Sequence, residues 1–185
     1  DYYKVMLALK PAVESFTDRF WNLNHNYEID ETIPGPPLGY DFMIYLRHHG
    51  FPSPLLDWTR SPYVAAFFAL RSQAPREDEY VAIYSYVEYC GDFSMSSFDE
   101  ARMVGLGPYV TTHKRHFNQQ SEYTICGKRV ENGYVYCSHE EVSERTKTRQ
   151  GLITKYIIPM TERRKALEKL HIMNINAYSL FGHEE

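Results

Sequence analysis

The residue types needed for nucleophilic and metal chemistry are present, but their spacing does not match the common sites. Serine, histidine and aspartate all occur, yet no G-x-S-x-G segment places a serine on a sharp strand-to-helix turn. His48 and His49 are adjacent, so on a helix they would point about 100° apart and would not share a zinc ion. The three cysteines form no C-x-x-C pair. We therefore expect neither a metal site nor a hydrolase of a common kind.

Glycine-rich phosphate loops are also missing, since neither G-x-G-x-x-G nor G-x-x-x-x-G-K-[ST] occurs. A bound nucleotide would need another kind of site. Two other segments concentrate polar and aromatic residues. The first runs from Arg47 to Thr59, ends in LLDWT and is followed by Ser61-Pro62. The second runs from Arg115 to Ile125 and contains the run QQSEYTI.

Together these segments resemble the FRG domain family, whose members carry a Q-H-Y-G-L-P-T-R-L-L-D-W-T-like segment, then S/N-P and A-L-Y-F-A, and later R-x-x-x-Q-x-G-x-F. The resemblance covers about residues 2–181. The chain departs from the pattern at four positions, where Arg47, His49, Pro54 and Ser121 stand in place of Gln, Tyr, Arg and Gly. It also lacks the Phe/Tyr-Arg-Gly tripeptide that names the family. We expect a single FRG-like domain over residues 1–185 that lacks its first strand.

The resemblance implies an α+β fold like that of ADP-ribosyltransferases of the Arg-Ser-Glu kind, with a split pair of small antiparallel sheets flanked by helices. It implies NAD as the substrate. In this comparison Thr59-Arg60-Ser61 fits the second motif and Gln120-Ser121-Glu122 fits the third. Glu122 would be the catalytic carboxylate. The residues expected to hold NAD are Arg47, Asp57, Trp58, Thr59, Ser61 and Tyr63, and those expected to contact the acceptor are Arg115, His116 and Gln119.

The expected role of Glu122 follows from the bond that breaks. Cleaving the bond between nicotinamide and ribose builds oxocarbenium-like charge on the ribose. A carboxylate that holds a ribose hydroxyl stabilises this transition state more than the ground state. Gln120, two residues earlier on the same expected strand, would point to the same face, where its amide could orient an acceptor without ionising.

Each assignment also has a structural alternative. Glu122 could be a solvated residue at the start of a strand, because glutamate is rarely buried unless it is paired. Ser61 is adequately explained as a helix cap. The structural reading is favoured for Asp57, in a turn, and for Trp58, in the core. Arg47 and Arg115 would equally suit bidentate binding of a pyrophosphate or ordinary ion pairs.

Helices are expected mainly in the first half of the chain, where they would position the LLDWT segment. Apolar spacing predicts helices over residues 11–22 and 40–49, the second ended by Gly50. The proline-rich residues 30–39 predict a linker loop. Ser61 and Pro62 predict the start of a buried helix over residues 63–70. Near the carboxyl end, Thr161 is expected to cap a helix that carries Leu167 and Leu170.

Strands are expected in the second half. Alternating side chains predict a strand over residues 80–87, and further strands are expected over residues 123–126, 134–137 and 152–159. Residues 140–150 should form a charged loop or a short helix. This order of elements favours an α+β class.

Composition narrows the kind of protein. Among 185 residues, 20 Lys+Arg stand against 24 Asp+Glu, a balance that argues against binding to nucleic acid mainly through counterion release. No apolar run has the roughly 18 residues that a membrane span needs. The family resemblance, and not the composition, implies a cytoplasmic enzyme of a toxin or anti-phage defence type that modifies RNA, DNA or protein and is held silent by an antitoxin or inhibitor protein. A non-catalytic binding module within a larger complex and a structural subunit are the alternatives.

Overall fold

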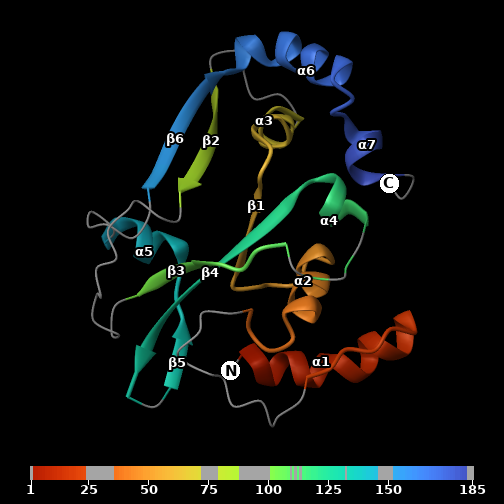
Figure 1. Ribbon diagram of the computed structural model, residues 1–185, viewed down its shortest axis with the longest axis vertical. Helices are drawn as coiled ribbons and strands as arrows, with labels where there is room; N and C mark the ends of the chain where they lie inside the picture. Colours follow the sequence, from red (N-terminus) through yellow and green to blue (C-terminus); the bar gives the residue numbers. More distant parts are fainter. Residues whose placement is uncertain are drawn as a thin grey trace.

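Two antiparallel sheets form the frame of this computed structural model (Figure 1), which describes residues 2–23, 36–71, 79–87, 101–108, 110, 112, 114–131, 133–145 and 152–182. The larger sheet has the order β1-β4-β3, and β5 pairs with β4. Its strands are β1 (Leu55–Thr59), β3 (Arg102–Gly105), β4 (Ser121–Val130) and β5 (Gly133–Tyr136). The smaller sheet is a ribbon of β2 (Tyr80–Val87) and β6 (Leu152–Pro159). The predicted α+β class is therefore confirmed.

The register of β1 against β4 brings the two informative segments together. Trp58 lies opposite Glu122, and Asp57 lies opposite Tyr123. Because paired residues share a face while successive residues alternate, Trp58 and Glu122 project from one face and Asp57 and Tyr123 from the other. The LLDWT segment and the carboxylate of the third motif are thus neighbours.

Helix α2 (Tyr40–His48) supports the second of these faces. Its buried residues Phe42, Met43 and Ile44 join the main hydrophobic core with Tyr123. The rings of Tyr40 and Tyr123 meet edge to face at 6.0 Å between centroids. The helix ends as expected, because Gly50 adopts the left-handed φ of 78° and donates its N–H to the Arg47 carbonyl.

Helix α1 (Tyr2–Thr17) begins earlier than the predicted helix over residues 11–22. Pro11 lies inside α1 and not in its first turn. The turns before the proline are retained because Met6 is buried in the main core. Asp18, at φ 52°, ends the helix and bonds its N–H to the Glu14 carbonyl, so residues 18–22 are not helical. Phe20 lies beyond the helix and is exposed.

Three helices lie at the end of the molecule that carries the ribbon (Figure 1). They are α3 (Pro62–Arg71), α6 (Arg163–Ile172) and α7 (Ala177–Phe181). A second core joins them through Val64, Phe67, Leu170 and Leu180. The predicted start of α3 is confirmed, since Ser61 Oγ accepts the N–H of Val64 at 3.3 Å. The helix is buried on one side only, because Tyr63 and Phe68 are exposed.

The remaining elements show where the sequence predictions succeeded and failed. The strand over residues 80–87 is confirmed as β2, and the strands in 123–126, 134–137 and 152–159 fall within or beside β4, β5 and β6. Strand β3, helix α4 (Lys114–Asn118) and helix α7 were not expected. Residues 140–145 belong to a short helix, α5 (His139–Arg145), while 146–150 and most of the predicted 30–39 loop lie outside the described residues.

The prediction that Thr161 caps α6 is wrong. Thr161 lies in a short 3-10 helix, η1 (Met160–Glu162), and Glu162 is the residue that precedes α6 without a side-chain cap. The backbone is already helical at Glu162 (φ -83°, ψ -6°), so Thr161 is one residue too early to accept the first free N–H groups. In the described part of the chain, no helix has the length and apolar character to cross a bilayer.

Candidate functional site

A cleft of about 840 Å³ lies between the larger sheet, the ribbon and the start of α3. The larger sheet contributes Trp58, Thr59 and Glu122 to its lining, and Arg60 lines it from the turn that follows β1. The ribbon contributes three tyrosines, Tyr84, Tyr86 and Tyr156, with Ile83, Ile157 and Ile158 beside them. Concave sites of this size, mostly apolar with a few convergent polar groups, are typical of small-molecule binding.

Glu122 is the carboxylate of this cleft. Its side chain is 24% exposed, and its Oε1 lies 3.3 Å from Nε of Arg60, which is 62% exposed. An ion pair with so exposed a partner is screened by water and contributes little to stability. Arg60 can therefore exchange Glu122 for an anion of a ligand at small cost. The carboxylate faces a cleft and not bulk water alone, as the proposed catalytic role requires.

Aromatic rings form the wall next to Glu122. The rings of Trp58 and Tyr86 lie 5.7 Å apart with 37° between their planes. Trp58 belongs to the larger sheet and Tyr86 to the ribbon, so their contact joins the two walls. Flat rings with polar tips suit a heteroaromatic ligand, which can stack on the rings while its edges find hydrogen bonds.

Thr59 and Ser61 shape the turn out of β1. Thr59 Oγ1 donates to the Gln119 carbonyl at 2.6 Å and accepts the N–H of Ser61 at 3.1 Å. Ser61 is buried and caps α3. Both hydroxyls are therefore engaged within the protein, but Thr59 lines the cleft and Ser61 does not. These two residues therefore hold the second motif in place.

Gln120 does not lie on β4, so the prediction that it shares a strand face with Glu122 is wrong. The strand begins at Ser121, and Gln120 has a left-handed φ of 49° that breaks the alternation. Its N–H bonds to the Phe117 carbonyl, and its carbonyl accepts from Arg60. The Gln120 side chain is exposed in this turn, next to the arginine that pairs with Glu122.

Arg47 and Asp57 pair with each other, with Arg47 Nε 2.7 Å from Asp57 Oδ1. By strand alternation Asp57 projects from the face opposite Trp58 and Glu122. Tyr63 is exposed in the first turn of α3. The structure therefore brings Trp58, Thr59 and Glu122 together at the cleft, and does not bring Arg47, Asp57 and Tyr63 to its lining.

The residues expected to contact an acceptor are engaged within the protein. Gln119 Nε2 donates to the Leu180 carbonyl of α7 at 3.2 Å, and its neighbour Asn118 donates to the Ser179 carbonyl. The guanidinium of Arg115 lies 5.6 Å from the centre of the Phe181 ring. These contacts attach α7 to the segment that leads into β4.

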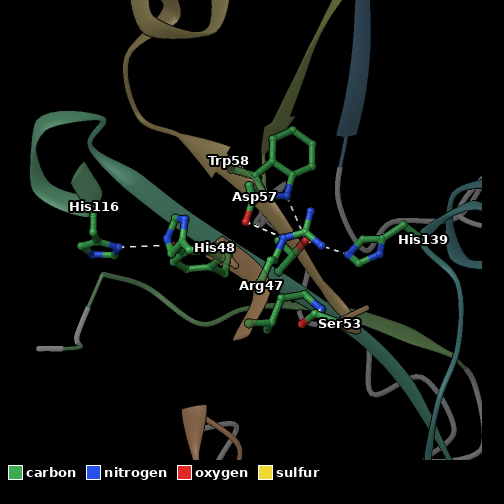
Figure 2. A network of polar contacts seen from close by, with 10 residues as sticks. Arg47, His48, Ser53, Asp57, Trp58, His116 and His139 are labelled. Carbon is green, nitrogen blue, oxygen red and sulfur yellow. Dashed lines mark hydrogen bonds and ion pairs between the residues drawn. The ribbon is translucent and has the colours of Figure 1, made fainter. Parts of the chain in front are cut away.

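His116 is 1% exposed and lies behind the cleft. Its Nε2 donates to the Pro108 carbonyl at 3.3 Å, because that oxygen can only accept. Its Nδ1 then accepts from the Tyr123 hydroxyl at 3.4 Å, and His48 Nε2 donates to the same hydroxyl at 3.0 Å. Figure 2 shows His116 and His48 side by side in this network. The three side chains tie α4 and α2 to β4 one residue from Glu122.

Burial favours the uncharged forms of His116, Tyr123 and Tyr40. It lowers the pKa of His116, to which the positive charge of Arg60 also contributes. Burial raises the pKa of Tyr123, with the charge of Asp57 acting in the same direction, and it raises the pKa of Tyr40, where Tyr123 and Glu122 act in the same direction. Each group favours the form without charge, as expected where desolvation dominates.

Three residues of the site, Arg60, Thr124 and His139, were not predicted individually from the sequence. The sequence signal for Arg60 was its position inside the second motif, between Thr59 and Ser61. Thr124 and His139 come together only through the fold and are described below. Among the described residues no group of three or more His, Cys, Asp or Glu side chains is placed to hold a metal ion.

Comparison with known proteins gives one match. Residues 6–78 match the FRG domain. The match includes β1, α3 and the LLDWT segment but ends before β2, so Glu122 lies outside it. No curated protein and no solved structure matches the chain.

Proposed function

Because residues 6–78 of this chain match the FRG domain, we propose that the protein is an NAD-dependent ADP-ribosyltransferase with Glu122 as its carboxylate. The observation that carries the proposal is the register of β1 and β4. It sets Glu122 opposite Trp58, within the FRG match, on the wall of a ligand-sized cleft. The proposed fold relationship is to the ADP-ribosyltransferase core, and two small sheets that flank a cleft agree with it.

The aromatic wall supports binding of a nicotinamide or adenine ring. A flat ring placed against Trp58 and Tyr86 would lie beside Glu122, because Trp58 is the cross-strand partner of that residue. The carboxylate would then lie near the ribose attached to the ring. In this position it would accept a hydrogen bond from a ribose hydroxyl and stabilise positive charge as the bond to nicotinamide breaks.

Arg60 gives the cleft its cation. NAD carries a pyrophosphate, and a guanidinium can bind a phosphate group in a bidentate manner, through two parallel hydrogen bonds. We propose that Arg60 leaves Glu122 for the pyrophosphate when NAD enters. Binding would thereby release the carboxylate for the ribose. The high exposure of the Arg60 side chain supports this exchange.

The proposed acceptor is a nucleic acid or a protein, and the proposed setting is a toxin or an anti-phage defence system with an antitoxin or inhibitor partner in the cytoplasm. The support is the resemblance to the family. Gln120, exposed in the turn beside Arg60, is the residue proposed to orient the acceptor. It has no carboxylate, so arginine is disfavoured as the target, since deprotonating a guanidinium requires a nearby anion.

A second candidate is a non-catalytic module that binds a nucleotide in the same cleft. The observation that favours it is the Arg60–Glu122 ion pair. If that pair persisted with ligand bound, the carboxylate would be neutralised and the cleft would bind without cleaving.

The deciding experiment is incubation with labelled NAD and separate RNA, DNA and protein pools. We expect label in one pool and release of nicotinamide. Glu122→Gln should reduce both by roughly 10²- to 10³-fold. Asp57→Asn makes the same chemical change on the neighbouring strand, at a residue that faces away from Glu122, and it should leave both within about twofold. Saturable NAD binding without label or nicotinamide would favour the binding module, and no NAD binding would overturn both candidates.

A further inference from the structure

A chain of three polar side chains runs from the cleft wall into the protein. Trp58 Nε1 donates to Thr124 Oγ1 at 2.9 Å, and that oxygen lies 2.8 Å from Nε2 of His139 (Figure 2). Thr124 is buried, and His139, the first residue of α5, is partly buried. The indole is thus held at its nitrogen by β4 and α5, while its ring contacts Tyr86 of the ribbon.

The donors and acceptors of this chain determine its direction. An indole nitrogen can only donate, so Thr124 Oγ1 must accept from Trp58. The remaining hydroxyl hydrogen of Thr124 points to His139 Nε2, which accepts it when the neutral imidazole carries its proton on Nδ1. The indole N–H, the Thr124 hydroxyl and Nε2 of His139 then each have a hydrogen-bond partner. A proton on Nε2 would make His139 a second donor to the same oxygen, and the hydroxyl hydrogen would lose its acceptor.

We propose that Thr124 and His139 are positioning residues that hold the Trp58 indole in the cleft wall, and that protonation of His139 loosens this hold. Trp58 would make the contact with a flat ligand ring, and the other two residues would act through it. The effect on NAD binding rests on the proposed function. The hold on the indole does not, because its two hydrogen bonds join side chains of the protein alone.

The surroundings of His139 favour the neutral imidazole that the chain requires. Burial lowers the pKa of His139 and outweighs a hydrogen bond with the Thr124 backbone that raises it, while the positive charge of Arg47 lowers it further. Lys128 on β4 is paired with Glu141 of the same short helix at 3.2 Å. Among the charged side chains that the structure describes, those on the elements packed together here are Arg102 on β3, Glu122 and Lys128 on β4, and Glu140 and Glu141 on α5. Arg47 of α2 also acts on His139 through its charge. We therefore expect a fixed indole at neutral pH and a looser one in acid.

Tryptophan fluorescence can test the proposal without any ligand. The chain has two tryptophans, so Trp21→Phe leaves Trp58 as the only tryptophan, whose fluorescence can be excited selectively. In this background we expect emission to change in one step as the pH falls from about 8 to about 5, and acrylamide quenching to rise with it. Thr124→Val keeps the shape of the side chain and removes the hydroxyl. It should abolish the step and raise quenching about twofold already at neutral pH.

We call the hydrogen-bonded side chains of Trp58, Thr124 and His139 the relay. Three matched variants separate the effect of the relay from a general loosening of the sheet. Thr124→Ser keeps the hydroxyl and should keep the step. His139→Gln offers an amide oxygen to the Thr124 hydroxyl but does not titrate in this range, so it should keep low quenching and lose the step. Glu122→Gln removes the carboxylate opposite Trp58 and should keep the step.

A step that persists in His139→Gln overturns the proposal, as does unchanged quenching in folded Thr124→Val. Should Thr124→Val fail to fold by circular dichroism, Thr124→Ser and His139→Gln still decide the question. NAD added to the same proteins then tests the dependent part. Quenching of Trp58 by added NAD gives the affinity for NAD. We expect Thr124→Val to lower this affinity about fivefold. An intact relay whose emission NAD never changes would refute the proposed function and leave the relay standing.

Discussion

Glu122 and Arg60 differ in exposure, and this difference suits the different roles that we propose for them. The carboxylate is largely covered by the cleft, while its guanidinium partner is mostly in water. A covered charge can act on a bound substrate through a low dielectric, whereas an exposed one can move and exchange partners. Two predictions at the scale of single residues follow from this asymmetry.

Glu122→Gln should reduce NAD turnover by roughly 10²- to 10³-fold, comparable with the loss of one preorganised electrostatic contact. The change preserves shape and hydrogen-bonding capacity. Because the lost ion pair is largely solvated, the free energy of unfolding should change by no more than about 1 kcal/mol. Turnover and thermal midpoint should be measured on one preparation. A folded variant with unchanged turnover would mean that another group is the carboxylate.

Arg60→Gln should raise KM for NAD about tenfold and leave kcat nearly unchanged, because the pyrophosphate contact is present in both the ground state and the transition state. Arg115→Gln is the matched control. It removes the same charge from a side chain that stacks on Phe181, outside the cleft lining. A large fall in kcat for Arg60→Gln would place the arginine at the reacting bond instead.

At the scale of elements, Gly39 fixes the angle at which α2 begins. It adopts a left-handed φ of 72°, and a Cβ built there would collide with Leu23 Cδ2 and press on Met6. Gly50, at the other end of the helix, has φ 78° but open space around it. Both glycines thus have a left-handed backbone, but only Gly39 has neighbouring side chains where a Cβ would lie.

Gly50→Ala should cost about 1 kcal/mol of unfolding free energy, the penalty for a left-handed residue with a Cβ. Gly39→Ala should cost about 1–3 kcal/mol more, since overpacking adds to that penalty. Urea denaturation of both variants provides the comparison. Equal losses would show that Leu23 moves aside freely.

Local signals predicted the elements whose cause is local. Alternation over Tyr80–Val87, the Ser61 cap and Gly50 each depend on neighbours in sequence, and each prediction was confirmed. Strand β3 has only four residues and owes its conformation to pairing with β4, which lies far along the chain. Helix α7 did carry a local signal that was overlooked. The Asn176 and Ser179 side chains bond reciprocally to each other's backbone N–H in a capping box.

The candidate site divides in the same way. The resemblance identified both motifs, and the two-strand register that pairs Trp58 with Glu122 is consistent with them. The position of Gln120 was mispredicted because one left-handed residue shifts the start of a strand. Thr124 and His139 are separated by a strand, a turn and a further strand. Their contact depends on the packing of α5 and has no signature in spacing.

For the molecule as a whole, the buried histidines predict loss of stability in acid. The pKa values of His116 and His139 are both lowered by burial, so as the pH falls the unfolded chain takes up these protons first, near the ordinary value of 6.5. Stability is fully present above that pH and declines below it. The thermal midpoint should therefore fall between about pH 7.5 and about pH 5.5.

His116→Gln should flatten this dependence, since an amide can donate to the Pro108 carbonyl and accept from Tyr123 without titrating. His171→Gln, which replaces an exposed histidine of α6, should leave the profile of the parent protein intact. A midpoint that stays constant on acidification in the parent would contradict the prediction. So would an equal flattening by both substitutions.

The two walls of the cleft belong to separate hydrogen-bonded ladders that share no strand among the described residues. Side-chain contacts such as that of Trp58 with Tyr86 hold them at their present separation, and such contacts rearrange without breaking a backbone ladder. The cleft can thus widen or narrow as its contents require. For crystallography this means that NAD should be mixed with the protein before crystals grow, because a lattice formed around the empty cleft would fix its width and resist soaking.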